Sequence, residues 1–157
     1  MSIDNLKSLM DGFDPASLLP QLDTIMGKME FAMRIAVLAG PVILLFMGLA
    51  YLLVPPKEAN YYFGYRCYFG MGSVNAWRFT QRFAGAIWTL LGLGLAIVMA
   101  VISGSFAGQE IMDMIWAAVK CVTWEAILVG VSCLVINIIV AMRYDAKGEL
   151  RGRKAVK

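Results

Sequence analysis

Three long apolar runs constrain this chain more than any other feature of its sequence. The clearest is 35–54, with 20 residues and no charged side chain, and two more follow at 83–103 and 122–142. Twenty helical residues are about 30 Å long, which matches the hydrocarbon thickness of a bilayer. Since a segment in lipid has to satisfy its own backbone hydrogen bonds, each run predicts a membrane-spanning helix.

The composition agrees with a small polytopic membrane protein. Apolar residues make up 60% of the chain and charged residues 16%, against about 45–50% and about 25% in soluble domains. We therefore predict an all-α membrane protein of three transmembrane helices. The expected domains are an extracytoplasmic amphipathic segment at 1–32, a membrane domain at 33–142 with a structured cytoplasmic loop at 55–82, and a basic cytoplasmic tail at 143–157.

The segment 1–32 reads as an amphipathic helix. Asp14 followed by Pro15 is a favourable helix start, and apolar residues recur at helical spacing up to Met29. The helix could lie at the membrane interface, run into the first span or pack on its own protein. The segment lacks the basic start and adjoining apolar core of a standard signal peptide.

The second and third spans have polar flanks. Ser73 is a plausible N-cap for one continuous helix over 74–103, whose first turns would lie in the headgroup layer. Between the last two spans we expect a short loop, 104–120, with an amphipathic turn at 110–120. The charged tail is expected to fray into solvent. Small residues at four-residue spacing favour close helix contacts; they are Ala32, Ala36 and Gly40, and then Gly92, Ala96, Ala100 and Gly104.

The distribution of Lys and Arg predicts the orientation. Ten of the 14 basic residues fall in the first loop, the start of the helix after it and the tail. Cytoplasmic segments carry the excess of positive charge. The N-terminus is therefore expected outside and the C-terminus inside.

Several chemistries are excluded by what the chain lacks. It has no histidine, which removes histidine acid–base catalysis and histidine metal ligands. Its three cysteines, Cys67, Cys121 and Cys133, form no zinc-type or disulfide pattern. Without paired carboxylates or a phosphate-binding loop, we expect no enzyme activity, no metal and no cofactor. Because the orientation rule already explains the basic tail, we expect no direct nucleic-acid binding.

The polar loop between the first two spans holds most candidate site residues. Arg66 could bind a lipid phosphate or a partner carboxylate, or simply extend to the headgroups. Trp77 could be an interfacial anchor or part of the loop's packing, and Arg78 with Arg82 could form a basic face or only follow the orientation rule. The candidates for partner or lipid binding are Asn60, Gly64, Tyr65, Arg66, Ser73, Trp77, Arg78 and Arg82.

Two polar residues fall inside the third span. Glu125 lies near its start, where Lys120 or Arg34 could pair with it, and an intramembrane carboxyl is by default a functional candidate. Asn137 lies deeper and is expected to form a hydrogen bond between helices.

The polar loop also carries a family pattern. It has Asn60, then Gly64, Tyr65 and Arg66, then Ser73 and Trp77 leading into an apolar helix. This resembles the SdpI family of bacterial membrane proteins, although members often have a Thr and few aromatics where this chain has Cys67, Tyr68 and Phe69.

The resemblance implies an inner-membrane protein that gives immunity to a secreted peptide toxin or senses it, and that holds a transcriptional repressor at the membrane. The expected partners are thus membrane lipids, a peptide outside and a repressor inside. The alternative is a small homo-oligomeric channel or transporter, with Glu125 and Asn137 lining a pathway. A lipid-handling enzyme ranks last.

Overall fold

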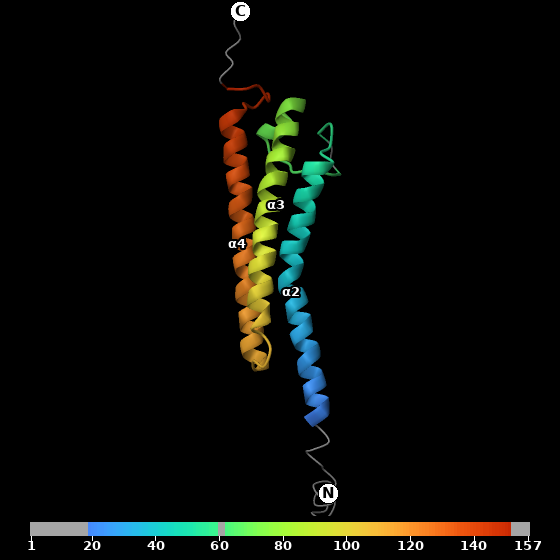
Figure 1. Ribbon diagram of the computed structural model, residues 1–157. Helices are drawn as coiled ribbons and strands as arrows, with labels where there is room; N and C mark the ends of the chain where they lie inside the picture. Colours follow the sequence, from blue (N-terminus) through green and yellow to red (C-terminus); the bar gives the residue numbers. More distant parts are fainter. Residues whose placement is uncertain (1–18, 60–61, 152–157) are drawn as a thin grey trace, which may run out of the picture.

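The computed structural model describes residues 19–59 and 62–151, and its main elements are long helices. Within these residues α2 (Leu19–Leu53), α3 (Val74–Gly104) and α4 (Ile111–Arg143) are each long and apolar enough to cross a membrane. They run up, down and up beside one another, and the short helix η2 (Phe69–Met71) precedes α3 (Figure 1). Over the described residues the protein is therefore helical with three candidate spans, which supports a multi-pass membrane protein.

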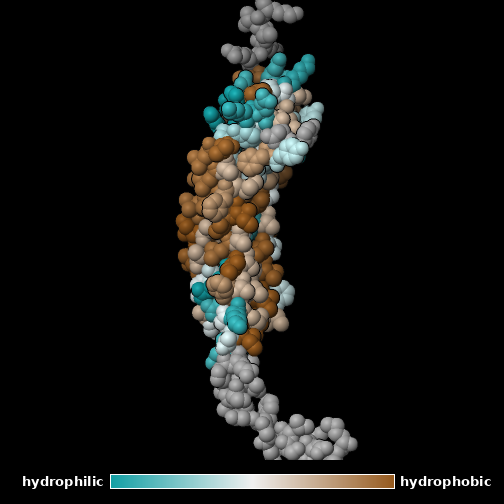
Figure 2. Space-filling view, turned by 90° about the vertical axis from the view of Figure 1, so that its right-hand side faces the viewer, coloured by the Kyte–Doolittle hydropathy of each residue, from teal (hydrophilic) through white to brown (hydrophobic). Residues whose placement is uncertain are grey.

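The surface has the polarity of a membrane protein. On the face drawn in Figure 2, hydrophobic residues cover the middle of the bundle and hydrophilic residues gather toward both ends. Large side chains such as Phe46, Leu90 and Val101 are more than 60% exposed. In a bilayer these apolar side chains face lipid rather than water, so their exposure costs no hydrophobic free energy.

The first helix continues beyond the predicted span on its N-terminal side. α2 begins at Leu19 and passes through Pro41 without a break, as membrane helices tolerate. From Leu19 onward, the structure therefore agrees with a helix that runs into the first span. Residues 1–18 and Asn60 lie outside the described residues.

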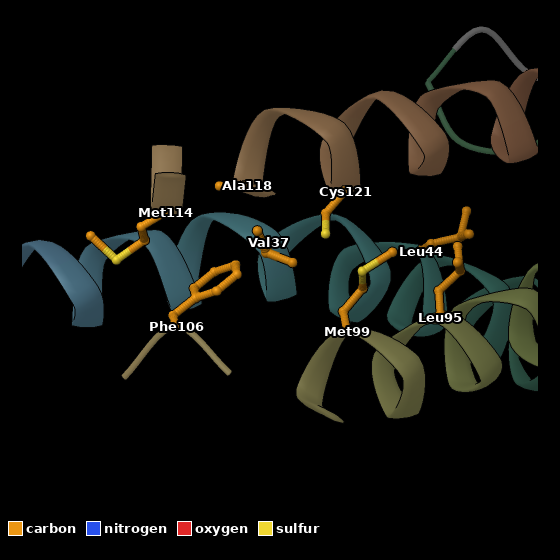
Figure 3. Packing of buried hydrophobic residues seen from close by; sticks show 8 residues of the cluster. All are labelled: Val37, Leu44, Leu95, Met99, Phe106, Met114, Ala118 and Cys121. Atoms are coloured by element: carbon orange, nitrogen blue, oxygen red, sulfur yellow. The ribbon is translucent and has the colours of Figure 1, made fainter. Parts of the chain in front are cut away.

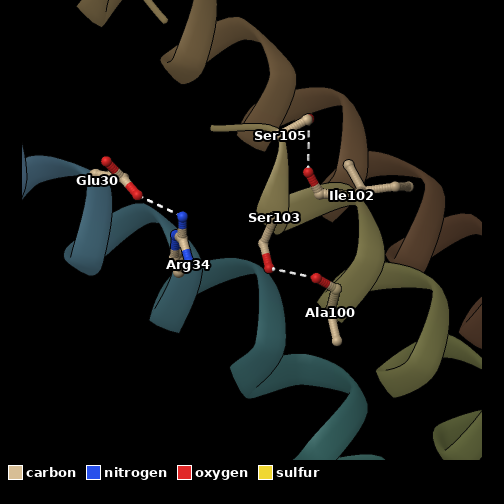
Figure 4. Close-up of polar contacts among 6 residues, drawn as sticks. All are labelled: Glu30, Arg34, Ala100, Ile102, Ser103 and Ser105. Atoms are coloured by element: carbon tan, nitrogen blue, oxygen red, sulfur yellow. Dashed lines mark hydrogen bonds and ion pairs between the residues drawn. The ribbon is translucent and has the colours of Figure 1, made fainter. Parts of the chain in front are cut away.

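The turn between α3 and α4 is shorter than expected. The sequence suggested a loop over 104–120, but α4 already begins at Ile111, so the amphipathic turn and the third span form one helix. At the end of α3, the Ser103 and Ser105 hydroxyls donate to the carbonyls of Ala100 and Ile102 (Figure 4). These bonds satisfy helix-end carbonyls and let the chain reverse within a few residues.

Two hydrophobic clusters hold the helices together. The first lies toward the α3–α4 turn and joins all three helices (Figure 3). Its buried members are Val37, Leu44, Leu95, Met99, Phe106, Met114, Ala118 and Cys121. The second lies at the loop end of the bundle, and its buried members are Tyr51, Ala76, Ala84, Ile136, Val140 and Tyr144.

Glycines set the close approach of α2 and α3, but only partly at the predicted positions. A Cβ on Gly92 would lie 2.5 Å from the backbone nitrogen of Leu45, and one on Gly85 would lie 2.9 Å from that of Leu52. Gly48 faces Thr89 just as tightly. In contrast, Gly104 faces open space. The predicted stripe on α3 is therefore wrong at Gly104 and omitted Gly85, and the stripe predicted on α2 omitted Gly48.

The start of the charged tail is folded, which corrects the expectation that it frays. Tyr144 and Leu150 form an antiparallel bridge, and the backbone nitrogen of Asp145 donates to the carbonyl of Glu149. The Asp145 carboxylate accepts the backbone N–H groups of Lys147 and Glu149 at 2.9 and 2.8 Å. Since Asp side chains readily close such local turns, the residues 144–151 form a compact hairpin, which we call the tail hairpin.

The candidate functional site, a motif loop locked onto α3

The loop between α2 and α3, residues 54–73, which we call the motif loop, is anchored by Trp77. This side chain is fully buried, and its indole Nε1 donates to the carbonyl of Pro56 at 2.9 Å. Gly64 lies against the ring at a φ of +124°, and a Cβ there would approach the ring carbon Cζ2 to 2.7 Å. Only glycine combines this φ with this approach. Of the two readings of Trp77, the structure therefore supports loop packing over interfacial anchoring.

Gln81 makes the second attachment, although it was not among the predicted site residues. Its side chain is fully buried one turn after Trp77. Its Oε1 accepts the backbone N–H of Tyr65 at 2.8 Å, and its Nε2 donates to the carbonyl of Tyr65 at 2.7 Å. The amide thus pairs with the loop backbone as a neighbouring strand would. The one available signal was an amide four residues after Trp77, on the helix face that meets the loop.

Tyr65 connects the loop to α4. Its hydroxyl contacts the Cys133 carbonyl and Asn137 Oδ1, each at 3.1 Å, and its ring meets the edge of Trp88 at 5.3 Å between centroids. Burial, followed by the neighbouring Cys133, raises the pKa of the Tyr65 hydroxyl, which keeps it a neutral donor. Asn137 was expected to bond between helices, but its bonding partner here is the loop.

Cys67 supports the turn that follows. Its carbonyl accepts the backbone N–H groups of Gly70 and Met71, which form η2. A Cβ on Gly70 would lie 2.5 Å from the hydroxyl of Thr80 and 2.7 Å from the sulfur of Cys67. Burial raises the pKa of the Cys67 thiol, so the thiol stays protonated and belongs to the packing rather than to a nucleophilic site.

Ser73 caps α3 as predicted and also binds the tail hairpin. Its side-chain oxygen accepts the backbone N–H of Ala76 at 3.2 Å and donates to the carbonyl of Gly148 at 2.7 Å. Gly148 has a φ of +74°, and a Cβ on Gly72 would lie 2.5 Å from its nitrogen. Two glycines are therefore needed where the tail hairpin meets the start of α3.

Positive side chains are exposed on the loop and on the first turns of α3. Arg66, Arg78 and Arg82 are all exposed, in contrast to the buried Trp77 and Gln81. Two further arginines lie over aromatic rings, Arg143 at 4.3 Å from the centroid of Phe79 and Arg151 at 5.7 Å from that of Phe69. The described predicted site residues thus divide into buried or half-buried ones that hold the loop and exposed cations that can meet a partner or a lipid phosphate.

The two polar residues predicted inside the third span, Glu125 and Asn137, do not lie together in the structure. Glu125 and Asn137 are 12 residues apart on α4, about 18 Å along its axis. Glu125 is buried against α2, whereas Asn137 is exposed on the loop side. Neither expected cation pairs with Glu125 in the described structure, because Arg34 pairs with Glu30 (Figure 4) and Lys120 points to the exterior.

A small cavity lies at the opposite end of the bundle from the loop. It measures about 300 Å³, near the lower limit for ligand pockets. The start of α2 supplies Asp23, Met26 and Glu30, and the α3–α4 turn supplies Phe106 and Gln109. Its lining thus combines apolar side chains with two carboxylates. In the described part of the chain, no group of three or more Cys, Asp or Glu side chains is placed to hold a metal ion.

Replacement of Gln81 by Leu tests the lock on the loop. Gln81→Leu leaves the N–H and carbonyl of Tyr65 without partners, so we expect a loss of stability of about 1–3 kcal/mol and faster proteolysis within 57–72. Unfolding in detergent and limited proteolysis measure the two effects. The neighbouring exposed position provides the control, since Arg82→Gln should change neither. Equal proteolysis of both variants would show that Gln81 does not hold the loop.

Comparison with known proteins assigns the chain to a family. The model of the SdpI/YfhL protein family matches residues 57–143, which is more than half of the 157 residues. No curated protein and no solved structure matches the chain. The matched region contains Gly64, Tyr65, Trp77 and Gln81, which lock the loop onto α3, together with α3 and α4. The chain belongs to the SdpI/YfhL protein family.

Proposed function

We propose that this protein is an SdpI-like integral membrane protein that senses an antimicrobial peptide or gives immunity to it. The observation that carries the proposal is the motif loop within the family match, held by Trp77 and Gln81 while Arg66 stays exposed. A loop locked at its centre presents its cations in a fixed arrangement. Such an arrangement favours recognition of a partner over unspecific attachment to headgroups.

The proposal includes an orientation in the bacterial inner membrane. The excess of Lys and Arg at the loop end supports placing the loop and tail hairpin in the cytoplasm and the start of α2 outside. The loop would then contact anionic lipid or a cytoplasmic repressor. The cavity beside Asp23 and Glu30 would face outward, where the Asp23 carboxylate suits a cationic side chain of a peptide, since Glu30 is paired with Arg34. The role is one of binding, without catalysis or direct contact with nucleic acid.

A survival assay tests the proposal. Cells sensitive to cationic antimicrobial peptides should survive a higher peptide concentration when they express the protein. Asp23→Asn should reduce that protection by weakening peptide contact, whereas Asp113→Asn, an exposed change outside the cavity lining, should not. Membrane levels of each variant are measured in parallel. An unchanged survival curve across a panel of such peptides would count against immunity.

Signalling is tested separately at the loop. Arg66→Gln should leave survival intact and weaken the recruitment of a cytoplasmic repressor to membranes, with Lys57→Gln as a control for charge alone. Retention of recruitment in Arg66→Gln would remove the proposed role of this residue.

The alternative of a homo-oligomeric channel or transporter gains less support. It would need Glu125 and Asn137 on one pathway, but Glu125 lies inside the bundle and Asn137 lies about 18 Å away beside Tyr65. Single-channel recordings of the purified protein in planar bilayers would detect a conducting assembly.

A further inference from the structure

Glu125 is an unusual residue in the apolar part of the bundle. Its side chain is only 6% exposed, and its Oε1 has no hydrogen-bond partner in the described structure. Its other oxygen, Oε2, lies 2.6 Å from the place where a Cβ on Gly40 would be. The absence of a side chain on Gly40 therefore makes a notch in α2 that the carboxyl fills.

Among the residues that the structure describes, no cation forms an ion pair with Glu125. On α2 the nearest ionisable residue is Arg34, which pairs with Glu30 and lies six residues from Gly40, about 9 Å along the helix. α3 has no ionisable residue between Arg82 and its end at Gly104. On α4 the neighbouring titratable group is the thiol of Cys121, one turn earlier, since Lys120 is exposed.

An ionised carboxylate is strongly disfavoured in such a place. Burial of an unpaired charge away from water costs several kcal/mol or more, whereas a neutral carboxylic acid costs far less. The acid form also has an O–H that can donate to a helix carbonyl, which a carboxylate cannot do. The geometry therefore fits the protonated group.

We propose that Glu125 and the Gly40 notch form a proton-binding site that couples the packing of α2 against α4 to pH. With its proton bound, the carboxyl stays in the notch and the helices pack closely. When the proton leaves, the carboxylate has to reach water, so it moves out of the notch and loosens this contact. The packed form binds the proton more tightly, so it is favoured at low pH and lost as the pH rises.

This inference is independent of the proposed function, because it needs neither a peptide nor a repressor. It assigns a binding site for a proton to the half of the bundle opposite the motif loop. The first hydrophobic cluster, which contains Val37 and Cys121, is the packing that the protonation of Glu125 would regulate (Figure 3).

Infrared spectroscopy of the full chain in lipid vesicles tests the protonation directly. We expect the C=O stretching band of a protonated carboxylic acid at about pH 7.5, where exposed carboxyl groups are ionised. The band should be absent from Glu125→Gln, whose amide has the shape of the neutral acid, and unchanged in the control Asp113→Asn. If the spectrum of Glu125→Gln shows the same protonated-acid band as the wild type, the proposal is overturned.

A second pair of variants keeps Glu125 in place and tests the notch. In Gly40→Ala the added Cβ displaces the carboxyl toward water, so the acid band should weaken at the same pH. In the control Gly130→Ala on α4, the added Cβ meets nothing within 4 Å and the band should persist. If the acid band is equally strong in Gly40→Ala and Gly130→Ala, the notch at Gly40 does not hold the protonated Glu125 carboxyl.

The coupling to helix packing is measured by thermal unfolding between about pH 6 and pH 9. Wild type should lose stability with rising pH relative to Glu125→Gln, which has no proton to release. If the stability of the wild type and of Glu125→Gln changes with pH in parallel, the coupling between protonation and helix packing is contradicted, even if the infrared band is present.

Discussion

Trp77→Ala is expected to destabilise the protein by about 3–5 kcal/mol, the range for removing a fully buried aromatic side chain. Trp77 is 0% exposed, and its loss also breaks the 2.9 Å hydrogen bond to Pro56 and leaves Gly64 without its packing surface. The loop should then separate from α3. Denaturant unfolding in detergent measures the stability, and proteolysis within the loop measures its release.

A tryptophan on the outside of α4 provides the matched control. Trp124 is 62% exposed, so Trp124→Ala removes the same chemical group from a lipid-facing position and should change stability by about 0.5 kcal/mol or less. Similar losses in both variants would mean that Trp77 acts only as an interfacial aromatic residue. A loss of stability in Trp77→Ala but not in Trp124→Ala would establish Trp77 as the anchor of the motif loop.

Gly92→Ala is expected to separate α2 from α3 and to destabilise the protein by about 1–3 kcal/mol. The new Cβ would lie 2.5 Å from the backbone nitrogen and 2.8 Å from the Cα of Leu45. Backbone atoms cannot turn aside as a flexible side chain can, so the helices have to move apart. The resulting strain should exceed the gain of about 1 kcal/mol in helix propensity from Gly to Ala.

Gly94, two residues further along the same helix, is the control for this substitution. A Cβ there meets nothing within 4 Å, so Gly94→Ala keeps the propensity gain without a clash and should be neutral or stabilising. Unfolding of both variants in detergent compares them. If Gly92→Ala were as stable as Gly94→Ala, the close approach at Leu45 would not be required.

Much of the fold follows from local sequence patterns. The three long apolar runs predict three spans because helices in lipid have to satisfy their own backbone bonds, and the described structure has a long apolar helix at each. Ser73 before an apolar run predicts the N-cap of α3, and its hydroxyl indeed accepts the N–H of Ala76. The order of Gly64, Tyr65, Arg66 and Trp77 indicates the family, and the family model confirms it.

The part of the site that depends on contacts between distant residues was not predictable. Trp77 could have been an interfacial anchor, and only its contacts with Pro56 and Gly64 decide that it is a core residue. Gln81 had no motif, because its role depends on the loop backbone 16 residues away. The tail hairpin was expected to fray, since its charge gave no sign of its contact with Ser73.

The sequence by itself determined the number of spans, the start of α3 and the family pattern of the loop, because hydropathy, capping and motif order are local properties. Only the tertiary structure decided which glycines face a neighbouring helix, where the loop attaches and that Glu125 fills the notch at Gly40. The physical reason is that lipid-facing and helix-facing positions are equally apolar in a membrane protein. Hydropathy therefore marks the spans but cannot identify the face along which each one packs.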